Sequence, residues 1–569
     1  MASYHYDRNT IGDIAVLGAE RFGDRLALAM AEGDGIGYRE LERLSRRAAA
    51  LLARLGVRKG DRVAILSENR PEWGLASLAI ARAGAVAVPI LADFPAEQVA
   101  NILAHSGARA AFVSEKLRRK LPEPGPQPLA IEALSEPRAD RELEWAADSF
   151  KGPEVEPGDL AAIVYTSGTT GQSKGVMLTH RNYIADALAC SVIIVLDPSD
   201  VLLSILPLAH AYEYTIGFLI PMMSGASVRY LDRPPSASVL LPALAKIRPS
   251  IVLSVPLVIE KVYRTGVKPN LEKIGLYRLA AARPLLERIA GRKLMKSFGG
   301  RLRFFGIGGA PLDPETERFL RAARFPYAIG YGLTETAPII AASAVGRTWP
   351  KAAGPALPGA EIRVADPRPA DDDPGLSVGE LQVRGPMVGP GYYKDEARTA
   401  EAFTPDGFFR TGDLGFLDEA GRFHVRGRLK TMILGPAGEN IYPEEVEALL
   451  NSSPYVLESL VYGDERGLTA LVQLKPEAIA AFASELGARV NAAVKDGIGE
   501  AAGAATRLGQ AAGGAIQNAE HAAAALLERI KKETNQRLAA FSRLSAVEVQ
   551  EEPFEKTPTQ KIKRFLYPK

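Results

Sequence analysis

The most informative segment of this 569-residue chain reads Asp159-Leu-Ala-Ala-Ile-Val-Tyr-Thr-Ser-Gly-Thr-Thr-Gly-Gln-Ser-Lys-Gly-Val-Met-Leu-Thr-His-Arg-Asn182. The apolar run at residues 161–165 is typical of a buried strand, and we expect a helix from about Arg181. Hydroxyl groups, exposed backbone N–H groups and one ammonium in a single loop favour a polyphosphate ligand. The candidate residues of this loop are Thr166, Ser167, Gly168, Thr169, Thr170 and Lys174.

The loop differs from other known phosphate-binding and catalytic motifs. A Walker loop needs Gly-Lys followed by Ser or Thr, whereas Lys174 lies between Ser173 and Gly175. The run Gly171-Gln-Ser-Lys-Gly175 does match the nucleophile elbow of α/β-hydrolases. That elbow turns directly from strand to helix, and here residues 167–170 separate Ser173 from the strand. An α/β-hydrolase that uses Ser173 is therefore a remote alternative.

The rest of the chain alternates strand and helix patterns, which is typical of a largely parallel sheet covered by helices. Short apolar runs predict strands at residues 62–67, 85–90, 110–114, 201–206, 251–254 and 301–306. Helical periodicity lies between them, at residues 38–55, 71–83, 95–105, 236–246 and 313–324. Extended pieces separated by Gly, Pro and Asp predict a small antiparallel β unit at residues 355–425.

Composition excludes several classes of protein. Lysine and arginine total 69 residues and aspartate and glutamate 67, so the net charge of +2 argues against binding nucleic acid through bulk positive charge. The single cysteine, Cys190, excludes an intramolecular disulfide, and we expect it to be a small buried residue. The most apolar stretch, residues 201–228, contains His210 and Glu213 and is a poor transmembrane span. We expect a cytoplasmic protein without a transmembrane segment.

Residues 165–176 resemble the phosphate-binding signature of the adenylate-forming (AMP-binding) superfamily, which includes acyl-CoA synthetases. The segment Leu206-Pro-Leu-Ala-His-Ala-Tyr-Glu213 resembles the histidine-bearing segment of long-chain fatty acyl-CoA synthetases. Further similar pieces follow in the family's order: Gly308-Gly-Ala-Pro-Leu-Asp313, Tyr331-Gly-Leu-Thr-Glu335, Arg410-Thr-Gly-Asp-Leu-Gly415, Gly427-Arg-Leu-Lys430 and Lys556-Thr-Pro-Thr-Gln-Lys-Ile-Lys563.

The resemblance implies an α/β fold in two domains. Residues 1–426 would form a large N-terminal domain of parallel α/β subdomains plus a small β-barrel-like subdomain, with the ATP and acyl pockets. Residues 427–430 would be a hinge, and residues 431–569 a small mobile α+β domain. Within the small domain, residues 490–530 are rich in alanine and glycine, which predicts an exposed helical excursion whose role is open.

The resemblance also implies the reaction and the substrates. A carboxylic acid would react with ATP to give an acyl-adenylate and pyrophosphate, and CoA would then take the acyl group. The family uses Mg²⁺, which Glu335 would hold. The resemblance assigns the other ATP contacts to Thr166, Ser167, Gly168, Thr169, Thr170 and Lys174 at the pyrophosphate end, Gly309, Ala310 and Tyr331 at the adenine, Thr334 at the α-phosphate, and Asp413 and Arg428 at the ribose.

Four further residues take roles from the resemblance alone. His210 would flank the acyl carboxylate, and Lys561 would contact that carboxylate and the α-phosphate. Lys430 would be the pivot of the hinge, and Gly438 would line the CoA tunnel. The chain departs from many family members at Gln560, where they have glycine.

We therefore expect an ATP-dependent ligase that joins a medium- or long-chain fatty acid to CoA. The alternatives are a fatty acyl-AMP ligase that loads a carrier protein, a ligase for aryl or other carboxylic acids, and a non-catalytic scaffold. We expect no nucleic-acid partner, and the sequence leaves open a peripheral membrane contact and a homodimer.

Overall fold

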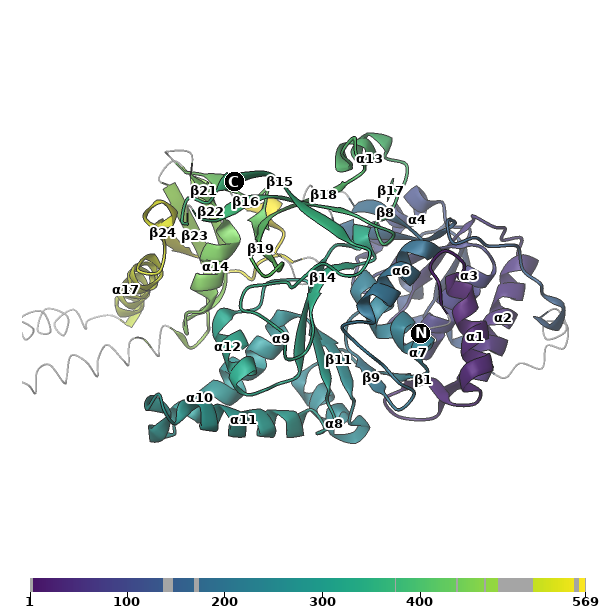
Figure 1. The fold of residues 1–569 in the computed structure, drawn as a ribbon, viewed down its shortest axis with the longest axis horizontal. Coiled ribbons are helices and arrows are strands. Elements are labelled where there is room, and N and C mark those ends of the chain that lie inside the picture. The colour runs from purple at the N-terminus through teal and green to yellow at the C-terminus, as the bar shows by residue number, and fades with distance from the viewer. Residues whose placement is uncertain are drawn as a thin grey trace, which may run out of the picture.

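The computed structural model describes residues 4–136, 147–167, 173–373, 375–435, 439–464, 467–478, 482, 515–556 and 562–567. Two large mixed sheets form the bulk of the molecule, and a smaller antiparallel sheet and a C-terminal α+β unit follow (Figure 1). The predicted α/β class is confirmed.

The first large sheet has seven strands in the order β17-β8-β7-β4-β3-β5-β6. Strands β7, β4, β3, β5 and β6 pair in parallel, whereas β8 pairs antiparallel with both β7 and β17. The bounds are β3 (Arg62–Leu66), β4 (Val86–Ile90), β5 (Ala110–Val113), β6 (Gln127–Ala130), β7 (Leu160–Ser167), β8 (Ser173–Thr179) and β17 (Gly391–Tyr392).

The second large sheet has eight strands in the order β14-β13-β12-β11-β9-β10-β1-β2. Its interior pairs are parallel, and only the edge strands β2 and β14 are antiparallel to their neighbours. The bounds are β1 (Leu26–Met30), β2 (Gly35–Gly37), β9 (Val201–Ser204), β10 (Ser227–Tyr230), β11 (Ile251–Ser254), β12 (Phe304–Ile307), β13 (Tyr327–Gly332) and β14 (Ile339–Ser343).

Helices cover the faces of both sheets, because βαβ connections place their helices there. Those associated with the first sheet and the junction between sheets are α1 (Ile11–Phe22), α2 (Tyr38–Arg54), α3 (Pro71–Arg82), α4 (Ala96–Ser106), η1 (Glu115–Lys120), α6 (His180–Cys190), the π-helix η3 (Glu213–Leu219) and α7 (Ile220–Ser224). Those that pack on the second sheet are α8 (Ala237–Ile247), α9 (Pro256–Lys261), the π-helix η4 (Val262–Val267), α10 (Lys268–Glu272), η5 (Gly275–Arg278), α11 (Arg283–Ser297) and α12 (Pro314–Ala322).

Helix α6 shows how the sequence fixes an element beside the site. The Thr179 hydroxyl accepts a hydrogen bond from the Asn182 backbone N–H, and the Asn182 side chain accepts one from the Thr179 N–H, which is a capping box. The helix is almost wholly buried, and its Cys190 is buried as the sequence predicts. Two buried polar residues of the helix accept hydrogen bonds from distant backbone groups: His180 Nδ1 from the Ile11 N–H and Asp186 Oδ1 from the Ile339 N–H, each at 3.2 Å.

The antiparallel β unit predicted at residues 355–425 is confirmed as a four-stranded sheet. Its order is β15-β16-β18-β19, with bounds β15 (Glu361–Pro369), β16 (Ser377–Arg384), β18 (Phe409–Leu417) and β19 (Phe423–Arg428). Helix α13 (Glu396–Ala402) lies between β17 and β18 in the chain. Because β18 pairs with β19, residues near the end of β19 lie opposite residues in the middle of β18.

The C-terminal unit has a hydrophobic core of its own, which includes Val446, Leu450, Val461 and Leu526. Its elements are β20 (Ile433–Leu434), β21 (Asn440–Ile441), α14 (Pro443–Asn451), β22 (Val456–Asp464), β23 (Gly467–Leu474), α17 (Ala515–Asn535) and β24 (Leu544–Val549). Helix α17 overlaps the end of residues 490–530, where we expected an exposed helical excursion, but its Leu526 and Ile530 are buried in the core of this unit. Residues 490–514 lie outside the described residues.

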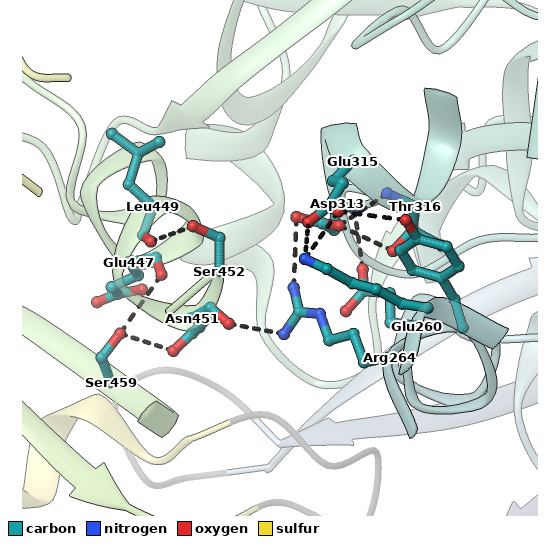
Figure 2. Close-up of polar contacts among 12 residues, drawn as sticks. Glu260, Arg264, Asp313, Glu315, Thr316, Glu447, Leu449, Asn451, Ser452 and Ser459 are labelled. Carbon is teal, nitrogen blue, oxygen red and sulfur yellow. Dashed lines mark hydrogen bonds and ion pairs between the residues drawn. The ribbon is translucent and has the colours of Figure 1, made fainter. Parts of the chain in front are cut away.

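Arg264, on the π-helix η4, connects the C-terminal unit with the second large sheet (Figure 2). Its Nη1 donates to the Asn451 carbonyl at the end of α14, at 2.6 Å. Its Nη2 lies 3.3 Å from Oδ1 of Asp313, the residue that caps α12. Within the described chain, no helix has the length and apolar character that crossing a membrane would require.

Candidate active site

The loop singled out by the sequence is the tip of a β-hairpin. Strand β7 pairs with β8 so that Thr166 lies opposite Lys174. Residues 168–172 at the tip, and with them Gly168, Thr169 and Thr170, lie outside the described residues. The Thr166 hydroxyl is buried and has no hydrogen-bond partner among the described residues, so this end of the hairpin offers an unused polar group.

The hairpin corrects two sequence interpretations. We expected a loop followed by the helix near Arg181, but residues 173–179 form the strand β8 before α6 begins. Ser173 is the first residue of that strand and does not lie in a strand-to-helix turn. The nucleophile elbow needs such a turn, so the α/β-hydrolase alternative is wrong.

Lys174, Glu335 and Tyr392 form a compact polar cluster at the base of the hairpin. The Lys174 Nζ lies 2.6 Å from Oε1 of Glu335, and the Tyr392 hydroxyl lies 2.8 Å from the same oxygen. Lys174 Nζ is also 3.1 Å from the Tyr392 hydroxyl and lies over its ring, 4.6 Å from the centroid. Lys174 belongs to the first large sheet, whereas Glu335 follows β13 of the second, so the cluster lies where the two sheets meet.

Glu335 keeps its negative charge although it is buried. Burial acts to raise the pKa of its carboxyl, but the Lys174 charge and the hydrogen bonds from Lys174 and Tyr392 outweigh that effect, so the pKa lies below its usual value. Its side chain is only 9% exposed. Tyr392, on the short strand β17, was not singled out from the sequence as a site residue.

Tyr331, Asp413 and Arg428 form a second cluster. The Tyr331 hydroxyl donates to Oδ2 of Asp413 at 2.8 Å, and Arg428 Nε lies 3.1 Å from Oδ1. The pairing of β18 with β19 sets Asp413 directly opposite Arg428. The structure therefore joins, through Asp413, three residues that the resemblance placed around one nucleoside.

Gly309, Ala310, Thr334 and Glu335 lie just beyond the carboxyl ends of the adjacent parallel strands β12 and β13. Ligands of open α/β sheets bind at such ends. Gly309 has a φ of +87°, a conformation that favours glycine, and Thr334 and Glu335 form the short 3₁₀ turn η6 (Thr334–Thr336). Local backbone geometry thus brings the predicted adenine, α-phosphate and metal residues to one edge.

His210 lies on the turn before η3, and the half-buried side chain of Asn69 fixes that turn. Asn69 Nδ2 donates to the Leu206 carbonyl at 2.6 Å, and the Leu208 N–H donates to Asn69 Oδ1 at 2.8 Å. The hydroxyl of Ser204 accepts a further bond from Asn69 and donates to the buried Glu213. Burial raises the pKa of Glu213 to about 8. Asn69 was missed in the sequence because nothing in a lone asparagine signals such a contact.

The remaining predicted residues are less informative. Lys430 is exposed and lies two residues after β19, at the start of the C-terminal unit. Gly438 and Lys561 lie outside the described residues. The side chain of Ser167, the last residue of β7, is also not described.

Comparison with known proteins settles the family. Residues 17–393 match the family model of the AMP-binding enzyme. This chain belongs to the AMP-binding enzyme family. All described members of the two polar clusters except Asp413 and Arg428 fall within the matched residues.

Among curated members of this AMP-binding family, the long-chain-fatty-acid–CoA ligase FadD15 of Mycobacterium bovis is 34% identical over 492 residues, which cover 79% of each chain. The peroxisomal long chain acyl-CoA synthetase 7 of Arabidopsis thaliana is 31% identical over 76% of this chain and 67% of its own. Among solved structures, ATP-bound MatB from Rhodopseudomonas palustris superposes with a TM-score of 0.73 at 25% identity and covers 98% of both chains.

The donor set of this AMP-binding enzyme fits a magnesium ion that arrives with ATP. Mg²⁺ in nucleotide sites is commonly bound by one or two carboxylates plus phosphate oxygens and waters. Glu335 supplies one charged carboxylate, and the described residues contain no group of three or more His, Cys, Asp or Glu side chains able to form a protein-only cage. The residues present therefore suit a metal held jointly by protein and phosphate.

Proposed function

We propose that this enzyme joins a medium- or long-chain fatty acid to CoA in two steps. In the first, a carboxylate oxygen attacks the α-phosphorus of ATP, and pyrophosphate leaves. In the second, the CoA thiol attacks the acyl carbon, and AMP leaves. The observation that carries the proposal is the Lys174–Glu335 pair at the junction of the sheets, with the Tyr331–Asp413–Arg428 cluster as the matching nucleoside site.

The charges of the first cluster suit the triphosphate. Lys174 would bind its β- and γ-phosphates together with Thr166 and Ser167 and the loop residues Gly168, Thr169 and Thr170. Glu335 would hold Mg²⁺, which when bound neutralises the charge that develops on the leaving pyrophosphate. Thr334, adjacent to Glu335, would donate a hydrogen bond to the α-phosphate.

The second cluster suits the nucleoside. The Tyr331 ring would stack on adenine, with Gly309 and Ala310 as the opposite wall. The Asp413 carboxylate would accept hydrogen bonds from the ribose hydroxyls, and Arg428 would assist. Tyr331 and Arg428 already hold Asp413 in place, so ribose would meet a carboxylate whose position is fixed.

The acyl side rests on the turn that Asn69 holds. His210 would flank the acyl carboxylate, and the apolar residues of η3 and α7 follow it in the chain. From the family resemblance, Lys561 would bridge the carboxylate and the α-phosphate in the first step. The small domain, residues 431–569, would then rotate about Lys430 and bring Gly438 to the CoA tunnel.

Pyrophosphate release across acids of graded length, with and without CoA, tests the proposal. Each methylene buried in an apolar pocket contributes about 0.8 kcal/mol, or roughly fourfold in kcat/KM, until the pocket is full. We expect catalytic efficiency to rise through C10 and to plateau between C10 and C18. A preference for acetate or benzoate contradicts the fatty-acid assignment. Thioester formation with a phosphopantetheinylated carrier protein but not with CoA would assign the acceptor to the carrier.

Arg264 offers a test of the proposed domain rotation. It joins Asn451 in the C-terminal unit to Asp313, next to the adenine-side loop (Figure 2). A charge-assisted hydrogen bond contributes about 1.5–3 kcal/mol when it is well sheltered. Arg264→Ala should therefore slow the half-reaction that uses the described domain arrangement by about tenfold and leave the other half-reaction unchanged or faster.

The matched control for Arg264 is Lys268→Ala. Lys268 lies one helical turn away and pairs with Glu315 of α12, so its contact stays within the large sheet's helices. This variant should keep the ratio of the two half-reaction rates. An unchanged ratio in Arg264→Ala would show that its contact with Asn451 does not influence which half-reaction proceeds.

A further inference from the structure

The segment from η5 through α11 combines cations with exposed apolar side chains, and nothing in the proposed reaction uses it. Between residues 273 and 296 the only acidic residue is Glu287. The cations of the segment are Lys273, Arg278, Arg283, Arg288, Arg292, Lys293 and Lys296. A chain whose net charge is only +2 therefore concentrates positive charge on one short stretch.

Packing of α11 decides which side faces outward. Glu287, Gly291 and Leu294 are buried, and a side chain at Gly291 would collide with the Ala323 carbonyl of the segment after α12. The Glu287 carboxylate accepts hydrogen bonds from Tyr277 and Arg318, so its charge is neutralised on the inner side. The outward face keeps its cations without an acidic residue.

Large apolar residues are exposed along the same stretch. Leu276 is 60% exposed, Leu279 58%, Leu285 64% and Ile289 41%. Figure 1 shows α10 and α11 along one edge of the molecule, away from the strands that carry the site. Exposed apolar side chains that lie together on a protein surface, with polar residues around them, are typical of an interaction site.

A groove beside α11 collects four of these positive groups. It has a volume of about 400 Å³, and Arg288, Arg292, Lys296 and Arg324 contribute to its lining. None of these four side chains makes a hydrogen bond or ion pair with the described residues. The lining contains no acidic residue, so the groove suits a phosphate-bearing anion.

We propose that α11 and η5 dock this protein on an anionic phospholipid surface. The groove cations bind headgroup phosphates, and the exposed leucines enter the interface between headgroups and acyl chains. Surface cations are attracted to anionic lipid headgroups, and exposed apolar side chains add buried apolar area when they enter the interface. Apolar side chains would gain nothing from a nucleic-acid backbone, so a membrane is the better match for this face. The inference stands independently of the acid that the enzyme activates.

Sedimentation of the full chain with vesicles tests the proposal. The protein should bind vesicles that contain phosphatidylglycerol and should not bind pure phosphatidylcholine vesicles, and added salt should weaken the binding. Arg292→Glu/Lys296→Glu removes two attractive charges and adds two repulsive ones. Since each basic residue near an anionic surface contributes about fivefold in binding, we expect the partition coefficient to fall at least about 25-fold.

Two further variants separate charge from apolar insertion. Arg118→Glu/Arg119→Glu makes the same charge change on exposed residues of η1, beside the other large sheet, and should leave binding within about twofold of the original. Leu276→Ser/Leu279→Ser should weaken binding while its salt dependence stays the same. Two controls would show that all variants are folded. Their thermal unfolding midpoints should be equal, and so should their rates of pyrophosphate release with a short-chain acid that forms no micelles.

Several outcomes would overturn the assignment. Equal binding to neutral vesicles, or equal losses in the α11 and η1 charge variants, would remove this face from membrane binding. Displacement from vesicles by inorganic phosphate, but not by chloride at the same ionic strength, would make the groove a site for a soluble phosphate. Binding to duplex DNA without binding to vesicles would assign the face to a polyanion instead.

Discussion

Glu335→Gln should reduce acyl-adenylate formation by about 10²- to 10³-fold, because a neutral amide is a poor ligand for a hard cation and leaves several kcal/mol of charge stabilisation unmade. The substitution keeps the shape of the side chain and its ability to accept from Tyr392. ATP–pyrophosphate exchange, measured over a range of Mg²⁺ concentrations, reports the loss. Part of the rate should return at high Mg²⁺ if the weakened ligand is the cause.

Glu287→Gln is a matched control for this prediction. Glu287 is also a buried carboxylate that contacts one cation and one tyrosine hydroxyl, Arg318 and Tyr277. It lies on α11, away from the site, so its substitution should carry any general cost of removing a buried charge and should leave exchange within a few-fold. An undiminished exchange rate in Glu335→Gln would remove Glu335 from the metal site.

Asp413→Ala should raise the KM for ATP by about 10²- to 10⁴-fold in the adenylation reaction. Two ribose hydroxyls that each donate to a carboxylate contribute about 1.5–3 kcal/mol apiece, and alanine forfeits both. The change in kcat should be much smaller, because ribose contacts are similar in the ground state and the transition state. Initial rates of pyrophosphate exchange at graded ATP concentrations separate the two parameters.

Two variants show whether Asp413 acts on ribose directly. Tyr331→Phe removes the hydroxyl that donates to Asp413 but keeps the ring, so it should raise the KM only a few-fold. Asp418→Ala is the control for folding, because Asp418 follows the same strand β18 and accepts from Arg422 and His424. If Tyr331→Phe matched the loss in Asp413→Ala, Asp413 would serve to hold Tyr331 rather than to bind ribose.

Much of the fold could be predicted because its elements carry local signals. The strands at residues 62–66 and 86–90 contain apolar runs of at least four residues, and α3 begins at Pro71, a residue favoured in the first helical turn. Strand β8 was missed because Ser173, Lys174 and Gly175 have low strand propensity, and only pairing with β7 makes the segment extended. Tertiary pairing, rather than local preference, decided that element.

The site divides in the same way. Lys174, Glu335, Tyr331 and Asp413 were found because each lies in a short segment with a recognisable pattern. Tyr392 and Asn69 were not, since their importance comes from contacts with residues more than one hundred positions away, such as Lys174 and Leu206. Such long-range contacts leave no local pattern in the sequence from which they could be predicted.

The Lys174 ammonium and the Glu335 carboxylate neutralise each other's charge. Pyrophosphate alone would have to draw Lys174 away and strand a buried carboxylate, and a divalent ion alone would have to draw Glu335 away and strand a half-buried ammonium. In either case one charged side chain would lose its partner, which is costly for a buried or half-buried group. A magnesium–ATP complex would bring a cation for Glu335 and phosphate oxygens for Lys174 together, so neither side chain would be left without a partner. Under the proposed function, the pair would therefore favour binding of the magnesium–ATP complex over binding of either component alone.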